Sequence, residues 1–288
     1  MHNTYNLLSE WDIQFFNTWK HLAHPAYFSS PSPMVPCRAK WADGTQAETV
    51  KEIGVHNIYT SFPISILRKQ AFKSPIKEIL AIWQMRSNKI SDLGQIWSQW
   101  DIGDGTIGEA YGKQLAKVND KGVNQVDNLL HLLETDRYSR RMVAQMWNHE
   151  ESHLMSLTPC AYQIQLIVKP TYQGDILHMI LNQRSNDTIV AGSWNAMQYW
   201  ILLEMFARHS NMKVGKLHHI IGDAHVYDRH IEIAETLIEA YLKGSFRKPS
   251  PVLSIDYNIK HFYDFTVDDF TLSDYYPVHD VKNIEVAV

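Results

Sequence analysis

The stretch Leu157-Thr158-Pro159-Cys160-Ala161-Tyr162 decides how the rest of the chain is interpreted, because it contains one of only two cysteines in 288 residues. Pro159 restricts the backbone directly before Cys160 and places the thiol at the entrance of a predicted strand over residues 162–169. Arginines stand upstream at 140 and 141 and downstream at 184. Positive charge near a thiol stabilises the thiolate and lowers its pKa. We therefore interpret Cys160 as a nucleophile and the arginines as ligands of an anionic substrate.

The composition narrows the classes of protein to which this chain can belong. A mass of 33.4 kDa with 45% hydrophobic residues suits a globular protein with a substantial core. A formal net charge of -4 argues against a dedicated nucleic-acid binder. The first nine residues lack the pattern of a signal peptide, and no run of 18 apolar residues predicts a membrane span. Two cysteines make no disulfide framework, which favours a cytoplasmic setting.

Hydrophobic periodicity predicts the secondary structure. Helices are expected over residues 7–23, from residue 75 onward, and over 125–133, 194–208 and 230–242, with strands over 49–67, 141–147, 162–169, 176–184 and 214–221. A proline-rich connector follows the first helix at 24–36. Glu78 lies inside the apolar face of the helix that begins near Pro75, where a carboxylate is unfavourable unless it has a partner. Runs of strands separated from long helices favour an α+β fold over a regular βαβ array.

Several ordered motifs point together to one known family. These are Ser139-Arg140-Arg141, Pro159-Cys160, Gln183-Arg184-Ser185-x-Asp187, Asn195 and Gly222-Asp223-x-His225-x-Tyr227, together with the Glu78 helix, the Trp97 and Trp100 pair, Tyr111-Gly112-Lys113-Gln114 and the ending Val286-Ala287-Val288. Chance does not assemble such a set in this order and spacing. From about Arg38 to Val288, the chain therefore resembles the thymidylate synthase family.

The resemblance implies an α+β fold with a mixed β-sheet packed with helices, forming a homodimer through the sheet. It also implies one catalytic domain over residues 1–288, of which residues 1–36 are a divergent N-terminal helix and connector. The substrate would be deoxyuridine monophosphate (dUMP), and 5,10-methylenetetrahydrofolate would be the co-substrate. The product would be thymidine monophosphate (dTMP), formed through a covalent bond between Cys160 and C6 of the pyrimidine. No metal, membrane or dedicated nucleic-acid partner is implied.

The resemblance also implies a role for each matching residue. The catalytic residues would be Cys160, Glu78, Tyr111, Asn195 and Asp187. The nucleotide would be held by Arg38, Gln183, Arg184, Ser185, Asn195, His225 and Tyr227, and by Arg140 and Arg141 of the partner subunit. The folate would contact Ile96, Trp97, Trp100, Leu157, Asp187, Ala191, Trp194 and Val288. Guanidinium groups suit phosphate, and a carboxamide matches both N3–H and O4 of uracil.

The sequence departs from the family pattern at several positions. Ala161 follows the nucleophile where the family often has histidine, the segment 191–195 reads Ala-Gly-Ser-Trp-Asn, segment 66–69 differs, and Ser98 replaces a common acidic residue. These changes keep open an alternative enzyme, a deoxyuridylate hydroxymethylase, which hydrates the transferred methylene and releases tetrahydrofolate. Asn195 argues against a cytosine substrate in either case.

Two readings from other classes remain. His149-Glu150-Glu151-Ser152-His153 matches H-E-x-x-H, the signature of zinc hydrolases, in which both histidines lie on one face of a stable helix. The residues before this match are predicted to form a strand, and Pro159 ends any helix after it, so we interpret it as a surface loop. A catalytically inactive relative kept for binding is the other reading, although no residue needed for attack or nucleotide binding is missing.

Overall fold

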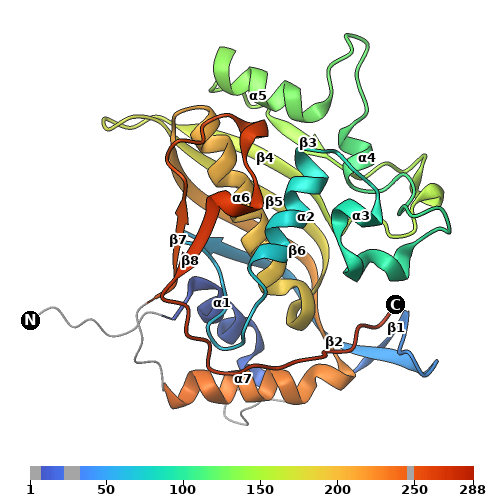
Figure 1. Cartoon of the computed structure of the whole chain (residues 1–288). Helices are drawn as coiled ribbons and strands as arrows, with labels where there is room; N and C mark the ends of the chain where they lie inside the picture. Colours follow the sequence, from blue (N-terminus) through green and yellow to red (C-terminus); the bar gives the residue numbers. More distant parts are fainter. Residues whose placement is uncertain (1–7, 23–32, 245–249) are drawn as a thin grey trace, which may run out of the picture.

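The structure is a computed structural model that describes residues 8–22, 33–244 and 250–288 (Figure 1). Its main sheet has six strands in the order β1-β2-β6-β5-β4-β3. These strands are β1 (Val35–Lys40), β2 (Gln46–Tyr59), β3 (Val143–Gln145), β4 (Ala161–Lys169), β5 (Ile176–Asp187) and β6 (Lys213–Tyr227). Strands β5 and β6 run parallel, whereas every other neighbouring pair is antiparallel. The sheet is therefore mixed, as predicted. A separate hairpin pairs β7 (Val252–Ile255) with β8 (Phe270–Ser273).

The helices pack mainly around one long, buried segment. They are α1 (Glu10–Trp19), α2 (Lys73–Trp83), α3 (Ile90–Leu93), α4 (Gly112–Leu115), α5 (Gln125–Thr135), α6 (Ser193–His209) and α7 (Ile231–Lys243). Most side chains of α6 are buried, because this helix packs against β5 and β6 on one side and α2 on another. Figure 1 shows α6 and α2 lying over the same region of the sheet. The α+β fold class is thus confirmed.

Strand β5 shows how the sheet separates two environments. Leu177, Met179, Leu181 and Gln183 are buried, and the residues between them are only partly buried. Because successive side chains of a strand point to opposite faces, the buried set faces the helices. Gln183 is the polar residue within this buried set.

The predicted helices 75 onward, 125–133, 194–208 and 230–242 correspond to α2, α5, α6 and α7. The helix predicted over 7–23 is found as α1 followed by a 3₁₀ turn, Lys20–Leu22, and most of the 24–36 connector lies outside the described residues. Strand 214–221 is longer than predicted, since β6 continues to Tyr227. The strand predicted over 141–147 is found as the shorter β3, the strand over 162–169 begins one residue earlier in β4, and the strand over 176–184 continues to Asp187 in β5.

The strand predicted over 49–67 is wrong beyond Tyr59. Residues 60–67 leave the sheet, and two carboxylates of α1 hold this segment: Glu10 accepts from the backbone N–H groups of Thr60 and Ser61, and farther along the chain the segment is held by buried Asp12. Its carboxylate accepts hydrogen bonds from the Ser65 hydroxyl at 2.6 Å and from the Ile66 backbone N–H at 2.9 Å. Burial raises the pKa of Asp12 to about 6, and the hydrogen bonds from Ser65, Ile66 and Ser9 act against this rise.

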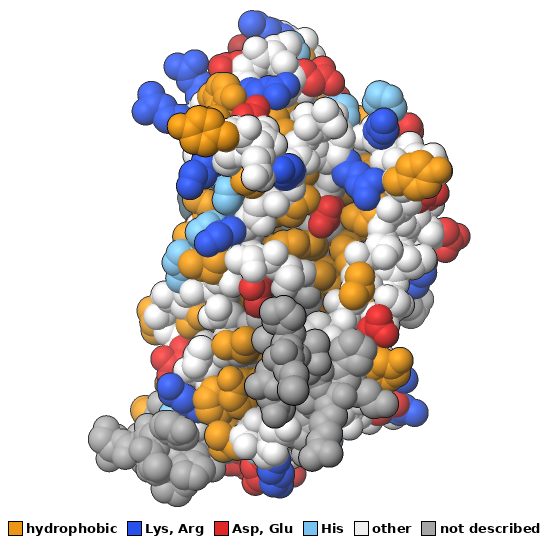
Figure 2. All heavy atoms as spheres, turned by 90° about the vertical axis from the view of Figure 1, so that its left-hand side faces the viewer, with side chains coloured by type: hydrophobic (Ala, Val, Ile, Leu, Met, Phe, Trp, Pro, Cys, Tyr) orange, Lys and Arg blue, Asp and Glu red, His pale blue; other side chains and the backbone are white. Residues whose placement is uncertain are grey.

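The surface carries charges of both signs. On the face in Figure 2, the acidic and basic side chains of the described residues are interspersed with hydrophobic ones. This mixture agrees with the formal net charge of -4. Every helix in the described part of the chain is too short or too polar to cross a bilayer.

Candidate active site

Cys160 lies immediately before β4 and is partly buried. Its Sγ is 3.7 Å from Nη2 of Arg184, and its backbone N–H donates to the Tyr111 hydroxyl at 3.2 Å. Burial raises the pKa of the Cys160 thiol, while Arg184 and Tyr111 act in the opposite direction. The predicted lowering of this pKa is therefore wrong for the chain as described, because desolvation outweighs the one arginine that lies beside the thiol.

Arg184 fixes the segment that presents Cys160. From β5, its Nε donates to the Pro159 carbonyl at 3.1 Å, and its Nη2 donates to the carbonyl and hydroxyl of Thr158 at 2.8 and 2.9 Å. The guanidinium also lies 5.7 Å from the centre of the Trp147 ring, within the range of a cation–π contact. The charge near the thiol is thus held in place by backbone carbonyls. The remaining N–H groups of Arg184 are available to an anion.

Tyr111 reaches Cys160 from a strained backbone. Its φ of 50° lies in the left-handed region that non-glycine residues rarely adopt. The next residue is Gly112, where a Cβ would lie 2.3 Å from the Ser87 carbonyl oxygen, so only glycine fits. The Tyr111 ring packs edge-on against Trp97, with ring centres 5.0 Å apart. Burial raises the pKa of Tyr111 well above its ordinary value, so its hydroxyl stays protonated at neutral pH.

Five side chains from four elements form a continuous hydrogen-bonded series, which we name the amide chain. His219 of β6 contacts Gln183 of β5 at 2.7 Å, and Gln183 contacts Asn195 of α6 at 3.0 Å. Asn195 then contacts Gln198 at 3.1 Å, and Gln198 contacts Glu78 of α2 at 2.7 Å. All except Asn195 are buried, so Asn195 is the member that a ligand can reach.

Glu78 ends the amide chain as a buried carboxyl group. Burial raises its pKa to about 7, and the side chains of Gln198, Trp97 and Trp194 oppose the rise. A carboxyl with a pKa near neutrality can both accept and release a proton under physiological conditions. The predicted pocket position of Glu78 is thereby supported by its burial and by its partner.

A second polar series runs along β6 and β2. Nδ1 of His225 lies 2.9 Å from Asp223, and Asp223 also forms an ion pair with Lys51 at 2.6 Å. Because a carboxylate only accepts hydrogen bonds, Nδ1 of His225 is the donor in this contact. Hydrogen bonding to His225 lowers the pKa of Asp223 to about 2. The rings of His225 and Tyr227 lie edge to face with centres 5.1 Å apart.

The aromatic residues expected on the folate side gather near Tyr111 and Glu78. Trp97 and Trp100 share the 3₁₀ helix Gln95–Trp100, and their ring centres are 5.4 Å apart. In the same helix Ile96 is 54% exposed, which leaves it free for a ligand. Leu157 is partly buried and packs against the main core.

Asp187 organises the segment that leads into α6. Its Oδ1 accepts the backbone N–H groups of Ile189 and Val190 at 3.1 and 3.0 Å, which caps a π-helix, Thr188–Gly192. Ala191 lies in this π-helix, and Trp194 follows in the first turn of α6. At the other end of the chain, the backbone of Val288 pairs with Lys40 of β1 through two hydrogen bonds of 2.8 and 2.9 Å.

The three other predicted phosphate ligands are exposed. Arg38 lies on β1, and Arg140 and Arg141 lie in the turn before β3. Within the described residues, none of the three forms an ion pair, so their charges are free to meet an anion. Ser185 follows Arg184 on β5 and pairs with Asp223 of β6, between the two polar series.

Comparison with known proteins decides the family. The model of the thymidylate synthase family matches residues 38–288. Thymidylate synthase 1 of Bacillus spizizenii is 41% identical over 249 residues, which cover 83% of this chain and 86% of that protein. The thymidylate synthase of Bacillus mojavensis is 41% identical over 262 residues, covering 87% and 90%. The solved thermostable thymidylate synthase A of Bacillus subtilis superposes with a TM-score of 0.83 at 36% identity, covering 96% of this chain and 99% of that chain.

The chain belongs to the thymidylate synthase family. Its activity is accordingly that of a methyltransferase, a thymidylate synthase, and the relatives support this function over the hydroxymethylase and the zinc hydrolase. The H-E-x-x-H match lies in a turn followed by a 3₁₀ helix, Ser152–Leu154, which lacks the α-helical face that zinc ligation needs. Throughout residues 8–22, 33–244 and 250–288, no group of three His, Cys, Asp or Glu side chains is arranged to hold a metal.

Two members of the amide chain were not predicted from the sequence. Gln198 follows Asn195 by three positions in α6, so helical geometry alone places the two on one side of the helix. That spacing was the available signal. His219 gave no comparable signal, because its contact with Gln183 depends on the pairing of β5 with β6.

Proposed function

We propose that the site converts dUMP to dTMP by attack of the Cys160 thiolate on C6 of the uracil ring. The observation that supports this mechanism is that a nucleophile, a cation and a carboxamide able to hydrogen-bond to uracil lie together. Arg184 binds Cys160 on one side, and Gln183, its neighbour in β5, binds Asn195 on the other. Attack at C6 moves electron density to C5 and O4, and an N–H of Asn195 is available to stabilise the negative charge at O4.

The phosphate is proposed to bind Arg184, Ser185 and Arg38 of one subunit, with Arg140 and Arg141 of the partner subunit. Guanidinium groups keep their charge and match phosphate oxygens in pairs. These cations would also offset the cost of forming a thiolate in the buried position of Cys160. Binding of the substrate phosphate and activation of the nucleophile are thereby linked.

The sugar and the proton transfers are assigned to the remaining polar groups. Nε2 of His225 and the hydroxyl of Tyr227 can each form a hydrogen bond with a ribose hydroxyl. Glu78 holds water and exchanges protons near O4 because its pKa is about 7. The neutral hydroxyl of Tyr111 is placed to help remove the proton from C5.

The folate-side residues provide an apolar, partly exposed surface. Ile96, Trp97, Trp100, Leu157, Ala191, Trp194 and Val288 would contact the ring system, and Asp187 would accept from its N–H groups. When bound, 5,10-methylenetetrahydrofolate supplies the one-carbon unit and the hydride that reduces it. The indoles would also exclude water from the transferred carbon, which favours reduction over hydration.

We infer that two copies of the chain associate through the face of the sheet that points away from the helices. Ile167 of β4 and Ile220 of β6 are 40% and 38% exposed there, and Ile58 and Ile180 are only partly buried. Apolar side chains repeated across several strands suit contact with a second sheet. The protein is proposed to be a single-domain homodimer, and a cytoplasmic location remains a prediction.

A mixing experiment tests the shared site. An Arg140→Ala/Arg141→Ala variant and a Cys160→Ala variant should each be inactive alone. After equal mixing and subunit exchange, half of the dimers combine both chains and hold one intact site, so about a quarter of the parent activity should return. If no activity returns although mixed dimers form, the arginines do not act across the interface.

The reaction itself is tested by incubating the protein with dUMP and 5,10-methylenetetrahydrofolate and analysing the nucleotide by mass and the folate by absorbance. We expect dTMP together with dihydrofolate. Hydroxymethyl-deoxyuridylate with tetrahydrofolate would instead establish hydration, and the altered segment 191–194 would then be the first place to seek its cause.

A further inference from the structure

The amide chain has a defined direction, because two of its members are held by backbone carbonyls. Nε2 of Gln198 faces the Pro75 carbonyl at 3.4 Å as well as Glu78, and Nε2 of Gln183 donates to the Ser185 carbonyl at 2.9 Å. Carbonyl oxygens only accept hydrogen bonds. Each glutamine therefore presents its NH₂ group to that carbonyl and its oxygen to the opposite side.

This direction passes through Asn195 and ends at His219. With the oxygen of Gln198 facing Asn195, the Asn195 NH₂ group must donate to it, and the Asn195 oxygen must accept from Gln183. The oxygen of Gln183 then faces Nε2 of His219 at 2.7 Å, so this ring nitrogen has to be the donor. In each of the four hydrogen bonds, the donor is consequently the residue farther along the amide chain from Glu78.

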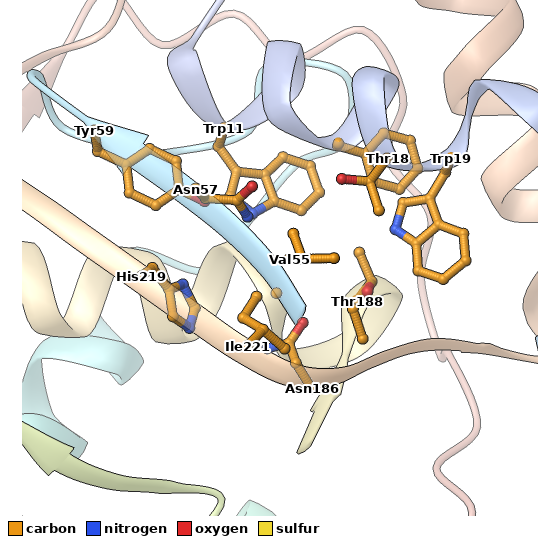
Figure 3. A pocket seen from close by; sticks show the side chains of 13 residues that line it. Trp11, Thr18, Trp19, Val55, Asn57, Tyr59, Asn186, Thr188, His219 and Ile221 are labelled. Carbon is orange, nitrogen blue, oxygen red and sulfur yellow. The ribbon is translucent and has the colours of Figure 1, made fainter. Parts of the chain in front are cut away.

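His219 has the protonation that this role requires. The ring is 1% exposed, and burial lowers its pKa to about 3, so it is neutral at physiological pH and carries one proton. Its Nδ1 has no hydrogen-bond partner among the described residues. The ring lines a cavity of about 20 Å³ beneath α1, together with Trp11 and Thr188, which is room for about one water molecule (Figure 3). A proton on Nε2 and a bare Nδ1 satisfy every contact that the ring makes.

We propose that His219 is the positioning residue that fixes the orientation of the Asn195 carboxamide and thereby selects uracil against cytosine. This inference rests on the proposed reading of the uracil edge by Asn195. Uracil presents a donor at N3 and an acceptor at O4, whereas cytosine presents an acceptor at N3 and a donor at its amino group. A rotated Asn195 carboxamide would fit cytosine, but its NH₂ group would then face the NH₂ groups of Gln183 and, at 3.5 Å, of Asn186, and its oxygen would face the oxygen of Gln198. Without the N–H of His219, only the Ser185 carbonyl still holds the Gln183 amide in this orientation, so rotating Gln183 together with Asn195 costs one hydrogen bond less.

A matched pair of substitutions tests the role. In His219→Gln, the side-chain Nε2 can replace the ring Nε2, whereas the amide of His219→Asn is one bond shorter and does not reach Gln183. We would measure binding of dUMP and of dCMP by calorimetry, without folate, and confirm folding by thermal unfolding. The dissociation constant of dCMP divided by that of dUMP should fall about tenfold in His219→Asn, equivalent to one hydrogen bond of about 1.4 kcal/mol. In His219→Gln, the ratio should stay within about threefold of the parent, since the donor is restored.

An unchanged ratio in folded His219→Asn would overturn the inference while leaving the proposed function intact. If the parent fails to bind dUMP, the proposed function fails instead. A measurement on the parent protein covers the case in which a variant does not fold: ¹⁵N NMR of labelled histidine, with the His219 signal assigned by its loss in whichever variant folds or by through-bond correlation. A proton on Nε2 that persists down to pH 5 supports the assignment, and a proton on Nδ1 refutes it.

Discussion

Replacing Gln198 by leucine should shift the pH dependence of catalysis. Gln198 is buried in α6 and donates to Glu78 at 2.7 Å while it accepts from Asn195 at 3.1 Å. Leucine has a similar volume and no polar atoms, so the substitution removes both hydrogen bonds without opening a large cavity. Glu78 then keeps its burial but loses its closest donor.

The size of the shift follows from that lost donor. A hydrogen bond to a charged group contributes about 1.5–3 kcal/mol, and one pKa unit corresponds to about 1.4 kcal/mol. Gln198 acts to lower the pKa of Glu78, which burial has raised to about 7. Its loss should therefore raise this pKa by about one to two units. If the carboxylate form is active, kcat at pH 7 should fall about tenfold and recover in large part near pH 9.

The assay is kcat for dTMP formation measured from pH 6 to pH 10, with the parent protein alongside. Gln84→Leu is the matched control, because Gln84 of α2 also donates to two carbonyls, of Phe262 and Phe265, at 2.6 and 3.2 Å. This control should lose stability but keep the parent pH profile. An unmoved midpoint in Gln198→Leu would refute the role of Gln198 in setting the protonation of Glu78.

Three further outcomes are expected. Because the pKa of Glu78 is raised from 4.5 to about 7, folding favours its protonated form, and stability is lost as pH rises between these values. Glu78→Gln should therefore raise the free energy of unfolding in urea by up to about 3 kcal/mol at pH 8, with little change at pH 4. The same substitution should abolish turnover. Asp12→Ala removes the acceptor of Ser65 and Ile66 and should lower the free energy of unfolding by about 2–3 kcal/mol, and an unchanged urea midpoint would contradict it. Deleting Val288 should lower kcat with little change in dUMP affinity measured by calorimetry, and equal losses in both would place its role at the nucleotide instead.

The sequence by itself determined the main elements and most of the site's residue types. Alternation placed β4 and β5, and helical spacing placed α6 and α7, because these patterns reflect burial along a single segment. The ordered motifs around Cys160 identified the family before any geometry was known, and the comparisons confirmed that family. Such motifs are local in the chain, so a linear reading detects them.

Only the tertiary structure decided how those residues behave. Whether the pKa of Cys160 is raised or lowered depends on how deeply the thiol is buried, and burial is a property of the packed protein. The end of β2 at Tyr59 is followed by residues bound to Glu10 and Asp12, which lie far upstream. His219 and Gln183 are 36 positions apart, and Gln198 and Glu78 are 120 apart. Hydrogen bonds and desolvation act over a few ångströms in space, so contacts between such distant positions leave no pattern in the sequence.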